Sequence, residues 1–134
     1  MKLFPYLIFN GNCEDAMNFY QSVFGGSINV MKRYSDAPMD IPEHYKNKIM
    51  HGELHFADNI LAACDAFPWK EVKNDTGVQL CINYSDDAEA AAVFKKLAAG
   101  GKISMSFEKQ FWNSSLGKLT DKFEKIWMIA SEAV

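Results

Sequence analysis

The sequence lacks the usual features of membrane, secreted and nucleic-acid-binding proteins. No apolar run approaches the ~18 residues of a membrane-spanning helix, so we expect no membrane insertion. The three cysteines, Cys13, Cys64 and Cys81, include no C-x-x-C pair, which argues against a disulfide framework and favours a reducing compartment. The net charge is −3 and the basic residues are scattered, so we do not expect nucleic-acid binding. These absences predict a cytoplasmic protein.

Motifs of several enzyme classes are missing as well. There is no glycine-rich phosphate loop, no G-x-S-x-G elbow and no H-E-x-x-H zinc motif. The apolar stretch 1–9 continues into Asn10-Gly11-Asn12 without the small-residue cleavage site of a signal peptide. We therefore interpret this stretch as a first strand.

What the sequence does contain is an internal repeat. Residues 16–28 and 91–103 align at a shift of 75 positions and share an alanine, a phenylalanine, a Gly-Gly pair and an isoleucine. Both segments place apolar residues at helical spacing and end at Gly-Gly, so we predict two helices. Asn12 and Asp86 are the predicted N-caps.

Short apolar segments surround each helix in the order β-α-β-β-β. The predicted strands are 3–9, 27–34, 50–57, 59–65, 78–84, 102–108, 115–120 and 125–130. A chain of 134 residues with 49% hydrophobic residues can bury one sizeable core. We predict a single domain, 1–134, with module one at 1–66, a connector at 67–76 and module two at 77–134.

One helix for four strands leaves one face of each sheet uncovered. In the segment 50–56, strict alternation puts His51, Glu53 and His55 on the face opposite the apolar residues of the same strand. In the segment 78–84, Gln79 and Cys81 alternate with apolar residues in the same way. We predict that these polar faces line a concave site.

Paired modules of this kind, with Phe19-Tyr20 followed by Phe24-Gly25-Gly26, resemble the vicinal oxygen chelate superfamily. That superfamily includes glyoxalase I, extradiol dioxygenases and the fosfomycin and bleomycin resistance proteins. Further segments resemble its PhnB-like branch more closely, namely Pro5-Tyr6-Leu7, Gly11-Asn12-Cys13, Lys48-Ile49-Met50-His51, Phe111-Trp112 and Leu119-Thr120-Asp121-Lys122-Phe123. Glu124 departs from the branch, which usually has glycine there.

The resemblance implies an α+β fold in which two βαβββ modules form a cup-shaped, mostly antiparallel eight-stranded sheet, the glyoxalase-like fold. It also implies a homodimer. The PhnB-like branch is often labelled demethylubiquinone methyltransferase-like, but the sequence lacks the glycine-rich loop of a doubly wound cofactor domain. Methyl transfer is therefore not what we predict.

The superfamily further implies a divalent metal held by His and Glu in the cup. By the spacing of its metal-binding members, the ligand positions fall on Pro5, close to Cys64, on Gln79 and on Trp127. Proline and tryptophan cannot ligate such an ion, and a glutamine amide is a poor ligand. A one-residue shift brings in Tyr6 and Met128 among others and yields no His/Glu set either. We predict no metal at the usual site and no other cofactor.

Two functions stay open at this stage. In the first, which we predict, the cup binds a small molecule through His51, Glu53, His55, Gln79, Cys81, Trp112 and Trp127. In the second, the protein is a metal-dependent lyase, isomerase or dioxygenase-like enzyme with relocated ligands, in which His51 and Glu53 are the candidate catalytic residues. The same side chains also have structural interpretations: a solvated or dimer-facing polar strand, a small buried thiol, and indoles that fill the cup or the module interface.

Overall fold

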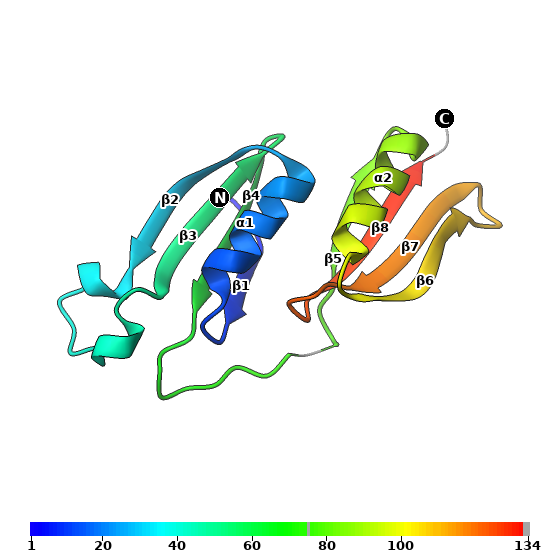
Figure 1. The fold of residues 1–134 in the computed structure, drawn as a ribbon. Coiled ribbons are helices and arrows are strands. Elements are labelled where there is room, and N and C mark those ends of the chain that lie inside the picture. Colours follow the sequence, from blue (N-terminus) through cyan, green and yellow to red (C-terminus); the bar gives the residue numbers. More distant parts are fainter. Residues whose placement is uncertain (75, 133–134) are drawn as a thin grey trace. The chain divides into compact units, whose positions relative to one another are not determined.

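Two α-helices and eight strands occur in the predicted order in the computed structural model, which describes residues 1–74 and 76–132 (Figure 1). The chain divides into two units, Met1–Lys73 and Asn74–Val134, and the division falls inside the predicted connector. Each unit repeats the order β-α-β-β-β. The α+β class and the two βαβββ modules are therefore confirmed.

Module one consists of β1 (Tyr6–Phe9), α1 (Cys13–Phe24), β2 (Ser27–Arg33), β3 (Ile49–Phe56) and β4 (Asn59–Asp65). Its strands form one sheet in the order β1-β4-β3-β2. The outer strand β1 runs parallel to β4, whereas β3 is antiparallel to both of its neighbours. The sheet therefore brings the first and last strands of the module side by side.

Module two consists of β5 (Leu80–Tyr84), α2 (Asp87–Ala98), β6 (Lys102–Lys109), β7 (Ser114–Thr120) and β8 (Ile126–Glu132). Its sheet has the equivalent order, β5-β8-β7-β6, and again one parallel pair, β5 with β8. The strands thus form two four-stranded mixed sheets, where we expected one eight-stranded sheet. The closure of both sheets around a common cup stays a prediction.

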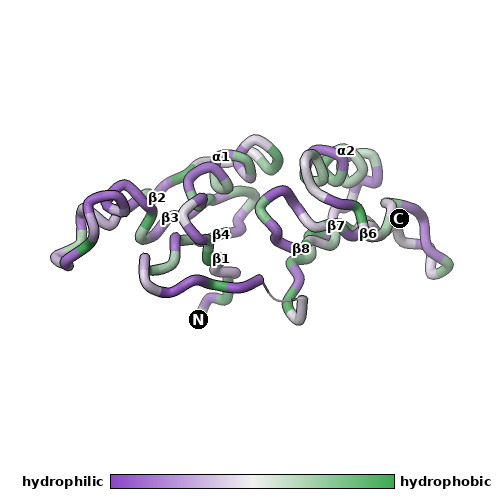
Figure 2. The backbone as a smooth tube through the Cα atoms, turned by 60° about the horizontal axis from the view of Figure 1, so that its bottom comes forward, coloured by the Kyte–Doolittle hydropathy of each residue, from purple (hydrophilic) through white to green (hydrophobic). Residues whose placement is uncertain are grey.

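Each helix covers one face of its own sheet, as Figure 2 shows for α1 over β1, β3 and β4. On α1, the fully buried residues Ala16, Met17 and Tyr20 lie on one stripe at helical spacing. On α2, Ala90 and Leu97 are fully buried in the same way. The opposite face of each sheet is left without a helix from its own module.

The N-terminus of α1 is capped from a distant strand. Asn12 occupies the predicted N-cap position, but its side chain forms no capping hydrogen bond within the described residues. Instead, Oδ1 of the buried Asp65 on β4 accepts hydrogen bonds from the backbone N–H groups of Gly11 and Cys13 at 2.9 and 3.0 Å. Its Oδ2 accepts a third from the N–H of Ile49 at 2.8 Å. A carboxylate at this end also complements the helix dipole.

The cap of α2 is the one predicted from sequence. The Asp86 side chain accepts a hydrogen bond from the backbone N–H of Ala88 at 3.2 Å. This bond satisfies one of the free N–H groups in the first helical turn.

At the Gly-Gly pairs the chain leaves each helix and returns to the sheet. Gly26 has φ +81°, and a Cβ there would collide with the carbonyl oxygen of His55 on β3. In module two, a Cβ at Gly101 would collide with the carbonyl oxygen of Thr120 on β7. Only glycine permits this close approach, which explains why the pair occurs in both modules.

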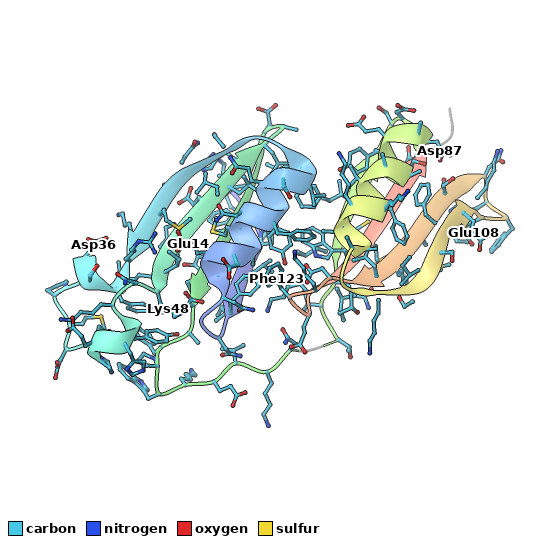
Figure 3. The ribbon with its side chains drawn as sticks, viewed as in Figure 1. Glu14, Asp36, Lys48, Asp87, Glu108 and Phe123 are labelled. Carbon is cyan, nitrogen blue, oxygen red and sulfur yellow. The ribbon has the colours of Figure 1, made fainter. Side chains whose placement is uncertain are left out.

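The segment between β2 and β3 is anchored to module one by hydrogen bonds. The hydroxyl of Tyr34 donates to the carbonyl oxygen of Asp65 at 2.7 Å, and that of Tyr45 donates to the carbonyl oxygen of Ala66. Both tyrosines are buried. Lys48, labelled in Figure 3, donates to the carbonyl oxygen of Gly11 at 2.8 Å. The segment therefore packs against the ends of β1 and β4.

No helix in the described part of the chain combines the length and the apolar character that a membrane crossing requires.

Candidate functional site

The candidate residues of β3 share the sheet face that α1 leaves open. Gly52 and Leu54 face the helix, because a Cβ at Gly52 would lie 2.6 Å from the Met17 sulfur and Leu54 is fully buried. The alternation of the strand then puts His51, Glu53 and His55 on the opposite face. Their side chains are 29%, 24% and 35% exposed, so they are partly shielded and still reachable from solvent.

These three side chains and Tyr6 form one hydrogen-bonded chain. The Tyr6 hydroxyl lies 2.8 Å from Nδ1 of His51, and Nε2 of His51 lies 2.7 Å from one carboxylate oxygen of Glu53. The other carboxylate oxygen lies 2.8 Å from Nε2 of His55. The Tyr6 and His51 rings are also close, with centroids 5.5 Å apart. The structure thus brings a phenol, two imidazoles and a carboxylate into one cluster, which we call the Glu53 cluster.

The protonation of the Glu53 cluster follows from its carboxylate. Hydrogen bonds from His51 and His55 lower the pKa of Glu53, so this group is a charged acceptor near neutral pH. An ionised carboxylate only accepts, which puts a hydrogen on Nε2 of both imidazoles. In the uncharged form of His51, Nδ1 accepts the Tyr6 O–H, whereas in the imidazolium form Nδ1–H donates to the Tyr6 oxygen. Burial raises the pKa of Tyr6 to about 12, which keeps the phenol protonated near neutral pH.

Strand pairing explains how Tyr6 reaches β3. Tyr6 pairs with Ala62 of β4, and Ala62 pairs with Glu53 of β3, so the three residues lie in one row across the sheet. The middle position carries only a methyl group, over which the phenol extends to His51. Sequence reasoning missed this role of Tyr6, because it put Pro5 at the site position of the first strand. The parallel pairing of β1 with β4 was the missing information.

Cys64 of β4 lies on the same face of the sheet as Tyr6 of β1. It pairs with Ile8, which is two residues after Tyr6 on β1. Burial raises the pKa of the Cys64 thiol, and a thiol that stays protonated is a weak nucleophile. The surroundings of Cys64 therefore favour a packing role.

Module two places Trp127 differently from the prediction. Trp127 pairs with Leu80, whereas Cys81 pairs with Met128, so Trp127 and Cys81 lie on opposite faces of the sheet. The Trp127 indole is 2% exposed, and its Nε1–H donates to Oδ2 of Asp121 at 2.8 Å. The expected place of Trp127 on the open face is corrected: it belongs to the helix side.

The other candidates of module two are exposed. Gln79 precedes β5, and Cys81 lies on its open face. Trp112 is 50% exposed in the turn between β6 and β7, where its ring contacts Phe111 edge-on at a centroid distance of 4.7 Å. Within module two, the structure does not bring these three side chains into one hydrogen-bonded cluster comparable to that around Glu53.

The residues at the superfamily's metal positions do not fit a divalent ion. The Pro5 side chain carries no ligand atom, and Trp127 offers only an N–H that is already bonded to Asp121. Within residues 1–74 and 76–132, no group of three or more His, Cys, Asp and Glu side chains has a geometry that could hold a metal ion. In the Glu53 cluster, the imidazole Nε2 atoms point at the carboxylate and satisfy it.

A family model and a curated relative assign the chain to the same family. Residues 1–130 match the family model described as 3-demethylubiquinone-9 3-methyltransferase. The chain is 32% identical to protein YjdN of Escherichia coli over 139 aligned positions, which cover 96% of this chain and 94% of YjdN.

Solved structures agree with this result. The crystal structure of PA1353 from Pseudomonas aeruginosa superposes with a TM-score of 0.91 at 36% identity, over 100% of this chain and 99% of PA1353. A Bacillus cereus PhnB protein, titled a putative 3-demethylubiquinone-9 3-methyltransferase, gives 0.82 at 25% identity, over 98% and 99% of the two chains. A glyoxalase-related enzyme from Fulvimarina pelagi gives 0.68 at 16% identity, over 98% and 89%, and shares the fold.

Proposed function

Because the chain belongs to the PhnB-like family of the vicinal oxygen chelate superfamily, which the 3-demethylubiquinone-9 3-methyltransferase model describes, we propose that it binds a small molecule without the superfamily's usual divalent metal. The ligand contacts the open face of module one at Tyr6, His51, Glu53 and His55. The observation that carries this proposal is the Glu53 cluster itself: four polar side chains bonded to one another on a face that the module's helix does not cover.

A structural role alone explains this cluster poorly. Exposed strand residues satisfy their polar groups with water, and holding several side chains in one geometry costs rotamer entropy. The cluster instead resembles a binding site, in which side chains are ordered before the ligand arrives. The described residues form mixed sheets and not a doubly wound parallel sheet, so methyl transfer with a nucleotide-type cofactor is not part of the proposal.

A ligand screen tests the proposal. A library of small polar-apolar compounds is screened by the shift in melting temperature, because any ligand that binds the native state stabilises it. Hits are then repeated on Glu53→Gln and on a control, Glu108→Gln, which changes an exposed glutamate of β6 in module two (Figure 3). We expect hits whose shift is lost in the first variant and kept in the second. A broad screen without a single such hit would overturn the proposal.

The second candidate is a metal-dependent enzyme with relocated ligands. The chemistry of the side chains favours it, since His51, Glu53 and His55 are donor types that divalent ions bind. Their described geometry does not hold an ion, so a metal would have to replace the bonds between the imidazoles and the carboxylate. Mass spectrometry of the protein, before and after incubation with Zn²⁺, Mn²⁺, Ni²⁺ and Fe²⁺, separates the candidates. About one ion per chain that is lost in His51→Ala would establish a relocated site and replace the first proposal.

The superfamily resemblance also supports a homodimer, which we include in the proposal. Light scattering at micromolar concentration gives the mass in solution, and a mass near the 15.2 kDa of one chain would overturn this part. The cytoplasmic location stays a prediction from the cysteine pattern.

A further inference from the structure

In one protonation state the Glu53 cluster uses all of its own hydrogen-bond donors. When both imidazoles are uncharged, each donates its Nε2–H to Glu53, and the Tyr6 O–H is donated to Nδ1 of His51. In this state all three polar hydrogens of the four side chains are used inside the cluster.

Acceptor atoms remain for a ligand. The Tyr6 oxygen keeps its lone pairs, Nδ1 of neutral His55 is an acceptor, and each carboxylate oxygen of Glu53 has a lone pair beyond the one that an imidazole occupies. The cluster also carries the negative charge of Glu53. Lys32 lies opposite His51 on β2, but it is exposed, so solvent screens its charge.

Apolar surface lies next to these acceptors. Ile8 follows Tyr6 on the same face of β1 and is 37% exposed, and the Tyr6 residue itself is 44% exposed. Ile60 of β4 pairs with His55 and is half-buried. A ligand bound at Glu53 can therefore also contact an isoleucine and the aromatic ring of Tyr6. The face of an aromatic ring attracts a cation.

From this combination we propose that both imidazoles are uncharged in the binding state and that the ligand is a small organic cation with N–H donors, such as an amine or an amidine, attached to an apolar group. Its N–H groups bind Glu53 and the Tyr6 oxygen, and its apolar group lies on Tyr6 and Ile8. The inference rests on the proposed function and names its ligand class. A carboxylate ligand finds neither a free donor nor a favourable charge at this cluster, and a neutral alcohol lacks the attraction to Glu53.

Three probes of equal size test the charge preference: benzamidine, benzyl alcohol and benzoate. Each is titrated near neutral pH while the backbone amide NMR signals of β1 and β3 are followed. We expect benzamidine to shift the signals of both strands in a saturable way and benzoate to leave them unchanged. Glu53→Gln should weaken benzamidine binding by about ten-fold or more, because a charge-assisted hydrogen bond is lost. Glu108→Gln should change nothing.

A third variant tests the sign of the electrostatic potential at the Glu53 cluster. Lys32→Gln removes a positive charge beside the cluster and should strengthen benzamidine binding by about two- to five-fold, in line with the energy of an exposed charge pair. Weaker binding in this variant would contradict a cationic ligand.

Other outcomes decide between this inference and the proposed function. Saturable benzoate or benzyl alcohol binding that equals or exceeds that of benzamidine overturns the cation class and leaves the binding face in place. If none of the three probes shifts β1 or β3, the cation class is overturned as well, and the ligand screen on Glu53→Gln then decides the proposed function independently.

Discussion

The Tyr6 hydroxyl is hydrogen-bonded to Nδ1 of His51 at 2.8 Å, although the strands that carry them, β1 and β3, are not neighbours in the sheet. The bond passes over Ala62 of the intervening strand, β4. It therefore fixes the ring of His51 from the first strand of the module, while Glu53 fixes it from within β3. Two anchors leave the imidazole one orientation.

Tyr6→Phe removes the first of these anchors. We expect the Nδ1 signal of His51 in ¹⁵N NMR to shift, because that atom loses its hydrogen-bond partner while Nε2 stays bonded to Glu53. The free energy of unfolding should fall by about 0.5–1.5 kcal/mol, the usual net value of one hydrogen bond. Tyr84→Phe, in module two, is the control that leaves His51 unchanged. An unaltered Nδ1 signal in Tyr6→Phe would show that the hydroxyl does not bond to the imidazole in solution.

Gly26→Ala and Gly25→Ala form a matched pair. Both glycines have positive φ, +81° and +76°, so alanine is strained at either position by about 1–2 kcal/mol. Only at Gly26 does the new Cβ collide with the carbonyl oxygen of His55, whereas at Gly25 it meets no described atom within 4 Å. We expect Gly26→Ala to lose about 1–3 kcal/mol more in urea unfolding. Equal losses would mean that the backbone yields freely at His55.

Asp65→Asn tests the distant cap of α1. The asparagine amide keeps one acceptor oxygen, but its NH₂ group faces an N–H group that it cannot accept from. We expect a loss of at least about 3 kcal/mol in the free energy of unfolding, since a buried charge-assisted contact is broken and polar groups are left unsatisfied. Asp58→Asn, at an exposed position with φ +62° that asparagine tolerates, should cost little. A small loss at Asp65 would argue that water replaces the carboxylate.

Acidification should weaken the fold partly through Glu53. Its pKa is lower in the folded chain than the ordinary 4.5, because His51 and His55 donate to it. The stability from this group is therefore present above pH 4.5 and is lost as the pH falls through the folded pKa. Unfolding curves of the wild type and Glu53→Gln, measured at a series of pH values, should converge on acidification. Parallel curves would contradict the assignment.

Alkaline conditions should lower the folding stability of module one, because three of its tyrosines ionise. Burial raises the pKa of Tyr6, Tyr34 and Tyr45 from 10.0 to about 12. A raised pKa means that the stability contribution is complete below pH 10 and is lost as the pH rises toward 12, because the unfolded chain ionises first. Absorbance of tyrosinate should show these three groups ionising late, together with unfolding. Their full ionisation near pH 10 in the folded protein would overturn this expectation.

Local patterns predicted much of this molecule. The alternation in 50–56 placed His51, Glu53 and His55 on one face, because a strand repeats every two residues and Leu54 fixes the buried side. The apolar stripe and the Gly-Gly pair at its end predicted each of the two helices. Each of these signals lies within one element and needs no knowledge of its neighbours.

The features that escaped prediction depend on contacts between distant segments. The side chain that accepts hydrogen bonds at the start of α1 is that of Asp65 and not that of Asn12, because β4 ends beside the start of the helix. Trp127 lies on the helix side because of its pairing with Leu80, which the sequence of β8 alone does not reveal. Tyr6 joins the Glu53 cluster through a parallel pairing with a strand more than fifty residues away.

The contacts of the two glycine pairs also show which positions of the modules correspond. Gly26 abuts His55 and Gly101 abuts Thr120, so these two β-strand residues are equivalent. By the same strand register, Tyr6 and Glu53 correspond to Cys81 and Lys118. The duplicated fold thus carries a carboxylate in one half and an ammonium group in the other. A ligand selected by the Glu53 cluster will saturate at a stoichiometry of one per polypeptide, despite the twofold repetition of the architecture.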